Sequence, residues 1–220
     1  MDEKTKDISA SRLIALADAE NISLDILLER QVIDRQAVID VAGPLILRHG
    51  DRVTMDEVSQ RTGYPAIYLL HEWHDICELI VDVYIDVTLA NTEQVMAEPP
   101  EGKSLIARLR EYTARGVDWV LEHEDFYLAV QRCVLKVNPD KQHAYLDLQR
   151  RIAGTFRATA LDPADDLITS TVEERDDLAR ALISAFNSDI RDLARTGTAE
   201  HITDTIIHHY RTILTGRLLK

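Results

Sequence analysis

The chain has 220 residues, with 25 lysines and arginines against 38 aspartates and glutamates, so its formal net charge is −13. This acidity argues against a protein that coats nucleic acid or anionic membranes without specificity. The length allows one large domain, or a small domain fused to a larger one, and it suffices to bury a substantial core.

The cysteine content and the first residues predict a cytoplasmic protein. The 2 cysteines are Cys77 and Cys133, and we expect buried free thiols rather than a disulfide or part of a zinc site. The first residues lack the apolar segment of a secretion signal. No apolar run approaches the roughly 20 residues that span a membrane, so we expect no membrane partner.

The residue pattern predicts an all-α protein. Only 8 glycines and 6 prolines occur, and Leu, Ile, Val and Ala recur at the three- and four-residue spacing of amphipathic helices. We expect about nine or ten helices in the whole chain. Residues 1–30 are predicted to form an N-terminal helical extension, with helix starts at Ser9 or Ser11 and at Ser23.

Residues 31–80 are predicted to form a helix-turn-helix unit, a module that normally carries its second helix into the DNA major groove. A first helix ends near His49-Gly50, and Pro44 is expected to kink or break it. Thr54-Met55-Asp56-Glu57 is a capping box that starts the next helix. In Thr62-Gly63-Tyr64-Pro65 the glycine permits a tight turn, and the proline suits the first turn of the helix that follows.

The remaining residues, 81–220, are predicted to form a second, larger helical domain. A linking helix over residues 75–97 joins it to the first unit, and the segment Glu98-Pro99-Pro100-Glu101-Gly102 is the expected domain boundary. Capping residues and glycine positions predict five further helices. Their expected ranges are Ser104 to His123, Asp125 to Val137, Pro139 to about Ala160, Ser170 to Arg195, and Thr198 towards Leu218.

The order of residues from about Ile39 to Ile80 is more specific than helix spacing alone. Val58-Ser59 is followed by Thr62-Gly63-Tyr64 and then by Leu69-Leu70-His71-Glu72-Trp73. These segments stand where the tetracycline-repressor (TetR) family usually has Ile-Ala, Ala-Gly-Val and Leu-Tyr-x-x-Phe, so the region resembles the N-terminal domain of that family. The resemblance implies that residues 81–220 form a ligand-binding and dimerisation domain.

The resemblance also implies a function and a set of partners. It predicts a ligand-responsive transcriptional regulator, a repressor, that binds a double-stranded DNA operator as a homodimer and responds to an unknown small-molecule effector. The residues expected to contact DNA are Arg52, Thr54, Arg61, Tyr64, Pro65, Ala66, Tyr68 and His71.

The charges of the helix-turn-helix unit fit DNA poorly. From Gln31 to Ile80 there are four arginines against eight acids, and no lysine occurs between Lys6 and Lys103. Phosphate neutralisation supplies most non-specific affinity, so such a face binds weakly unless its arginines are well placed. The alternative is a TetR-like scaffold whose DNA-binding face is degenerate and acts as a protein-interaction module.

The residues also bear on enzyme and metal chemistry. His71 and His74 form a histidine pair with acids nearby, but no third ligand is evident, so no metal site is expected. No nucleophile-and-base arrangement and no glycine-rich phosphate loop stands out. The sequence therefore predicts a protein that is not an enzyme, with no catalytic residues and no cofactor.

Two sets of residues in the second domain are candidates for its implied roles. Core packing is the alternative reading of the first set, which is aromatic-rich and is expected to line a small-molecule pocket. The second set forms apolar stripes on the last two helices, which would pair as a four-helix dimer interface. The pocket residues are Tyr112, Trp119, Phe126, Tyr127, Cys133 and Tyr145. The interface residues are Leu182, Phe186, Ile190, Ile206, Tyr210 and Ile213.

Overall fold

The computed structural model describes residues 10–19, 33–96, 104–168, 171–194 and 196–218. These residues form ten α-helices, and their only strand-like feature is an isolated bridge between Leu167 and Leu218. The predicted all-α class is therefore confirmed. The expected boundary at Glu98–Gly102 and the helix start at Ser23 lie outside the described residues.

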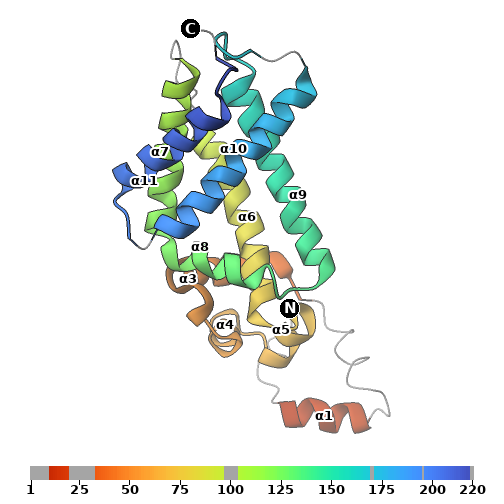
Figure 1. Cartoon of the computed structure of the whole chain (residues 1–220). Helices are drawn as coiled ribbons and strands as arrows, with labels where there is room; N and C mark the ends of the chain where they lie inside the picture. The colour runs from red at the N-terminus through yellow and green to blue at the C-terminus, as the bar shows by residue number, and fades with distance from the viewer. Residues whose placement is uncertain (1–9, 20–32, 97–103, 169–170, 195, 219–220) are drawn as a thin grey trace.

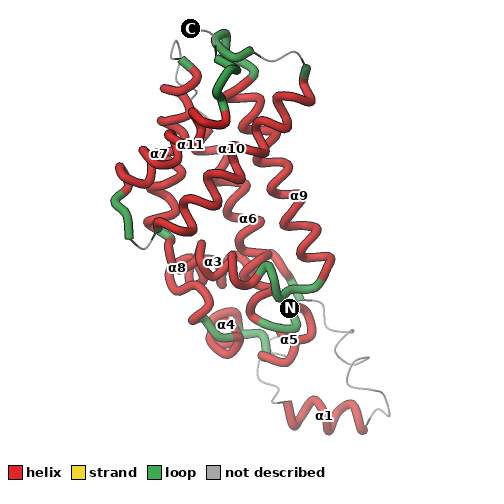
Figure 2. Tube along the Cα trace, in the orientation of Figure 1, coloured by secondary structure: helices red, strands yellow, loops and turns green. Residues whose placement is uncertain are grey.

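Figure 1 shows a small lower unit beneath a bundle of longer helices, and Figure 2 shows the helices that build both. The lower unit contains α3 (Arg35–His49), the short 3-10 turn η2 (Gly50–Arg52), α4 (Met55–Thr62) and α5 (Ala66–Trp73). The helix α1 (Ala10–Ala19) lies apart from the body of the molecule in this view.

The long helix α6 (Ile76–Met96) leaves the lower unit and runs up through the middle of the bundle. Around it stand the upper helices α7 (Leu105–Glu122), α8 (Glu124–Cys133), α9 (Pro139–Phe156), α10 (Val172–Leu193) and α11 (Ala199–Ile213). A single π-helical turn, η3 (Arg157–Leu161), continues α9.

Capping side chains start the helices where the sequence predicts them. Thr54 and Glu57 form both hydrogen bonds of the predicted capping box on α4, which satisfies backbone N–H groups that a helix start leaves unpaired. Ser104 and Thr198 cap α7 and α11 with one hydrogen bond each, accepted from the N–H of Ala107 and of His201. Gly63 ends α4 in the left-handed conformation at φ 74°, which glycine adopts without strain.

Pro44 does not break α3, so of the two expected outcomes, a kink or a break, the break does not occur. The helix is continuous from Arg35 to His49 with the proline inside it. Proline has no N–H that could donate a hydrogen bond to the carbonyl oxygen of Asp40. Both residues are exposed, so water can donate to that carbonyl instead. The opposite face of α3 is held by Val38 and Ile46, which are fully buried.

Two hydrophobic clusters hold the molecule together. The upper cluster joins α6, α7, α9, α10 and α11. The lower cluster contains Val58, Leu69 and Trp73 of the helix-turn-helix together with Phe126 of α8 and Leu148 of α9. The lower core therefore includes side chains from both predicted domains, so the helix-turn-helix is packed onto the bundle.

Candidate DNA-binding face and ligand cavity

Local hydrogen bonds fix the angle between α4 and α5. The Thr54 N–H donates to Glu57 Oε2 across 2.8 Å. Hydrogen bonding from Thr54 holds the pKa of the Glu57 carboxyl below its usual range. At the turn, Ser59 Oγ donates to the carbonyl oxygen of Tyr64 across 2.7 Å. The sequence thus builds the corner of a helix-turn-helix from short-range contacts.

The residues expected to contact DNA differ in their exposure. Four of them are exposed, three are half-buried, and Tyr68 is only 4% exposed. Burial also raises the pKa of the Tyr68 phenol. Its side chain therefore does not lie on the surface of the chain. The exposed residues are Arg52, Thr54, Arg61 and His71, and the half-buried ones are Tyr64, Pro65 and Ala66.

The basic residues of the lower unit are partly engaged by acids. Arg52 forms an ion pair with Asp125 of α8, and Arg35 binds acids that are described below. Arg48 and Arg61 are exposed, and neither forms an ion pair with another residue in the described parts of the chain. Part of the positive charge expected to meet phosphate is thus already neutralised within the protein.

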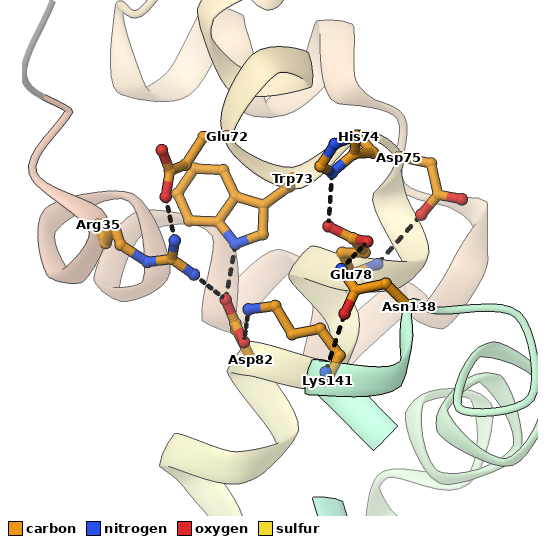
Figure 3. A network of polar contacts seen from close by, with 9 residues as sticks. All are labelled: Arg35, Glu72, Trp73, His74, Asp75, Glu78, Asp82, Asn138 and Lys141. Carbon is orange, nitrogen blue, oxygen red and sulfur yellow. Dashed lines mark hydrogen bonds and ion pairs between the residues drawn. The ribbon is translucent and has the colours of Figure 1, made fainter. Parts of the chain in front are cut away.

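A polar network lies where the lower unit meets α6 and α9 (Figure 3). Asp82 of α6, whose side chain is 11% exposed, is its centre. One of its oxygens accepts hydrogen bonds from Trp73 Nε1 and from an Arg35 nitrogen, each across 2.7 Å. The other accepts from Lys141 near the start of α9, and Arg35 also pairs with Glu72.

Glu78 extends the same network one turn earlier on α6 (Figure 3). It is 5% exposed, and it accepts a hydrogen bond from the amide of Asn138 across 2.6 Å. His74 Nδ1 lies 3.1 Å from the other Glu78 oxygen, and Asp75 accepts the Glu78 N–H as a helix cap. His74 has a φ of 46°, which is uncommon without glycine and places the α5–α6 corner under strain.

A second contact between the two parts lies at η2. Gly50 has a φ of 58°, and a β-carbon there would collide with the carbonyl oxygen of Asp125 and lie 3.3 Å from Ala129. Asp51 forms an ion pair with Arg132 of α8 at 2.8 Å. The end of α3 therefore rests directly on the backbone of α8.

The upper helices enclose a cavity of about 110 Å³, to which each of α6 to α11 contributes. Tyr112, Trp119 and Tyr127 line it, and the binding of a small molecule by these residues stays a prediction. The remaining three predicted pocket residues lie elsewhere. The cavity thus belongs to the bundle and not to the lower unit.

The prediction that Phe126, Cys133 and Tyr145 line the cavity is therefore corrected. The first two belong to the lower core because they lie on the side of α8 that faces α3 and α6. Burial and the adjoining thiol of Cys77 raise the pKa of Cys133, and both cysteines are buried and free, as expected. Tyr145 borders a separate depression between α9 and α10.

The stripes predicted for a dimer interface point into their own chain. Leu182, Ile190 and Ile206 are fully buried in the upper core, and Ile213 packs against it. Phe186 and Tyr210 line the cavity. Packing of α10 and α11 on α7 and α9 thus covers Leu182, Ile190, Ile206 and Tyr210 within the chain, whereas Phe186 and Ile213 are half-buried, and the dimer interface stays a prediction. Among exposed large apolar side chains of the described residues, only Val172 lies on α10 or α11.

Sequence reasoning missed the polar side of the cavity. Tyr84, Thr88 and Asn91 of α6 line it, as do Gln149 of α9 and Asn187 of α10. The three residues on α6 follow each other at spacings of four and three. That spacing places polar groups on one buried face, and it is the signal that would have found them.

The polar groups of the cavity form a loose chain of hydrogen bonds. Gln149 Nε2 donates to the Tyr84 hydroxyl at 3.4 Å, and Asn187 Nδ2 donates to Gln149 Oε1 at 3.2 Å. The Tyr127 hydroxyl donates to Asn187 at 3.4 Å. Burial raises the pKa of the Tyr84, Tyr127 and Tyr210 phenols, so the cavity is uncharged at neutral pH.

The described residues contain no group of three or more histidine, cysteine or acidic side chains arranged to hold a metal ion. None of their helices combines the length and the apolarity that crossing a membrane requires.

No protein-family model and no curated protein sequence matches the chain. Solved structures do match it over most of its length, at low identity. The chain therefore has the TetR fold.

Three of these similar structures are TetR-family regulators by name. One from Streptomyces coelicolor has a TM-score of 0.61 and 21% identity, with 83% of each chain covered. A second, from Rhodococcus sp. RHA1, has a TM-score of 0.61 and 18% identity, covering 82% of this chain and 95% of that one. The Thermus thermophilus repressor FadR, in complex with lauroyl-CoA, has a TM-score of 0.63 and 13% identity, covering 84% and 96%.

Proposed function

We propose that this protein is a ligand-responsive transcriptional repressor that binds operator DNA through α4 and α5, as a homodimer, in the cytoplasm. The proposal assigns it no catalytic role and no cofactor. An effector in the cavity would change the affinity for DNA by favouring one arrangement of the lower unit relative to the bundle.

The observation that carries the proposal is that α6 belongs to both sites. Near its start, Asp82 accepts the indole hydrogen bond of Trp73 on α5. Less than two turns further on, Tyr84 and Thr88 line the cavity. A rigid helix connects the two, so a small displacement at the cavity moves the end of the helix expected to enter DNA.

The helix α9 supplies a parallel connection. Lys141 and Asn138, at its start, bind Asp82 and Glu78 of the network. Further along, α9 contributes Gln149 and two other residues to the cavity. An effector that shifts α6 against α9 would therefore alter the contacts that hold α5. Coupling of this kind needs a two-state element, and the α6–α9 pair supplies the candidate.

The homodimer is proposed from the fold and from the symmetry of operator sites. Because the apolar stripes of α10 and α11 are buried within the chain, a dimer contact on these helices would use their outer faces. Sedimentation at micromolar concentration is the test, and a monomer there would remove the dimer from the proposal.

The DNA-binding step is tested with purified full-length protein and the DNA upstream of its own gene. At about 50 mM salt, where phosphate contacts are strong, we expect a mobility shift that weakens steeply as salt rises. Arg61→Ala should weaken the shift. Arg180→Ala, which removes an exposed arginine from α10, is the matched control and should leave it unchanged. A folded protein that gives no shift would overturn the proposal.

A second candidate function is a protein-interaction module on the same scaffold. The ion pair between Arg52 and Asp125 and the exposed Leu70 on α5, which is 43% exposed, favour it. Absence of any DNA shift at low salt would support this candidate over the first.

A further inference from the structure

We infer that the cavity binds an uncharged small molecule with an apolar body of about one ring and a hydrogen-bonding group that meets Thr88 and Tyr112. The inference rests on the proposed function, because it names the chemical class of the effector of the same regulator.

Among the described residues that line the cavity, none is Asp, Glu, Lys, Arg or His. The charged pair next to it is internally balanced. Arg115 forms an ion pair with Glu111 at 2.6 Å and donates to the carbonyl of Val95 at 2.9 Å. A charged ligand would lose its hydration in this cavity without gaining a counter-charge, so the site selects against it.

Two hydroxyls supply the polar contact. Thr88 is 7% exposed and Tyr112 is 3% exposed, and both residues line the cavity. Neither hydroxyl has a hydrogen-bond partner within the described chain. Thr88 lies near the Tyr84 hydroxyl and Thr159 near the Tyr112 hydroxyl, and each offsets part of the rise that burial causes in the pKa of that tyrosine, but neither pair of oxygens reaches hydrogen-bond geometry. A buried hydroxyl without a partner destabilises the protein, so a ligand group that pairs with it gains affinity.

The size and the apolar walls define the rest of the molecule. An engineered cavity of about 150 Å³ with apolar walls takes up benzene in another protein, so a cavity of about 110 Å³ suits a single ring with a short substituent. Trp119, Phe156 and Phe186 offer aromatic surfaces to such a ring. Lauroyl-CoA, which occupies the FadR structure, is far larger and carries phosphate charges, so this cavity does not suit it.

The test is a matched series of probes: benzyl alcohol, toluene, benzoate and benzylamine. Binding to the full-length protein is followed by calorimetry and by the rise in melting temperature. We expect benzyl alcohol to bind most tightly, toluene about tenfold more weakly for want of a hydrogen bond, and the two charged compounds at least about 100-fold more weakly. Equal or tighter binding of benzoate or benzylamine, or no binding of any probe, overturns the inference.

Substitutions locate the contact. Tyr112→Phe and Thr88→Val each remove one unpaired hydroxyl with little change of shape, so both variants should fold. Each should reduce the preference for benzyl alcohol over toluene, and the double variant should abolish it. Tyr68→Phe is the control, since Tyr68 lies on α5 in the lower unit, and it should leave the preference intact. An unchanged preference in the double variant would also overturn the inference.

The DNA shift separates this inference from the proposed function. Protein that shifts DNA but binds none of the neutral probes contradicts only the ligand class. If the protein binds benzyl alcohol with the expected preference but never shifts DNA, only the proposed function as a transcriptional regulator is contradicted.

Discussion

The indole N–H of Trp73 donates to Asp82 across 2.7 Å and so ties α5 to α6. Asp82 is 11% exposed in its side chain and also accepts from Arg35 and Lys141. One carboxylate therefore satisfies donors from three other helices. Its removal leaves Lys141 and the indole N–H without this acceptor, while Arg35 keeps its contact with Glu72.

We predict that Asp82→Ala lowers the free energy of unfolding by about 3 kcal/mol, because it breaks a largely buried ion-pair cluster. Urea denaturation measures the change. Asp86→Ala is the control, since Asp86 lies one turn further along α6 and is exposed, and it should change stability by less than about 0.5 kcal/mol. Equal losses in the two variants would show that the cluster adds no stability.

Gly50→Ala should destabilise the protein by at least about 2 kcal/mol, because alanine at positive φ is strained and its β-carbon meets a carbonyl that cannot move aside. Gly154→Ala is the opposite case. It lies within α9, a β-carbon there has no atom within 4 Å, and alanine should stabilise the helix by about 0.5–1 kcal/mol. Both values come from chemical denaturation, and a Gly50 variant as stable as the parent would contradict the packing described for η2.

Alkaline pH should unfold the protein through its tyrosines. Burial raises the pKa of Tyr84, Tyr127 and Tyr210 above the ordinary value. The unfolded chain releases these protons near pH 10 while the folded chain retains them, so the free energy of unfolding falls as pH rises above about 10. Each retained phenol steepens the fall by about 1.4 kcal/mol per pH unit.

Urea denaturation at a series of pH values, with tyrosinate absorbance followed in parallel, checks this prediction. Tyr84→Phe should make the fall shallower. Stability should be insensitive to these groups below about pH 9. Tyrosinate absorbance from all three phenols in the still-folded protein would contradict it.

Asp125→Asn should strengthen DNA binding if Arg52 contacts phosphate, because it frees the guanidinium from its ion pair. The pair is surface-exposed, so its loss should cost little stability. We expect a several-fold gain in affinity for DNA. The plot of the logarithm of the binding constant against the logarithm of the salt concentration should become steeper by about 0.9. Asp118→Asn removes the same charge from an exposed site on α7 and is the control. Identical effects of the two variants would exclude Arg52 from the contact.

The sequence predicts the lower unit well because that unit is built from short-range interactions. The Thr54–Glu57 capping box and the left-handed Gly63 depend on residues within one turn of each other. Pro44 shows the limit of such reasoning, since packing of Val38 and Ile46 against neighbouring helices keeps α3 continuous across it.

The candidate site is less predictable because an apolar or aromatic helix face can meet a core, a cavity or a partner. Helical spacing identifies the stripe that contains Leu182 and Phe186, but only the packing shows that the first lies in the core and the second at the cavity. Likewise Phe126 and Tyr127 are neighbours in α8, yet they face different cores. The choice depends on long-range contacts that no local pattern encodes.

The fit of Gly50 against α8 also determines which parts of this molecule are interchangeable. A main-chain carbonyl stands at position 125 whatever side chain the residue carries, and the small side chain of Ala129 lies beside the same contact. The glycine cannot vary, because no substitution at position 125 moves the carbonyl away from a larger residue. A chimaera that joins this helix-turn-helix to another bundle of the same fold therefore has to keep the glycine, and needs a helical backbone with a small residue at the position of Ala129 to receive it.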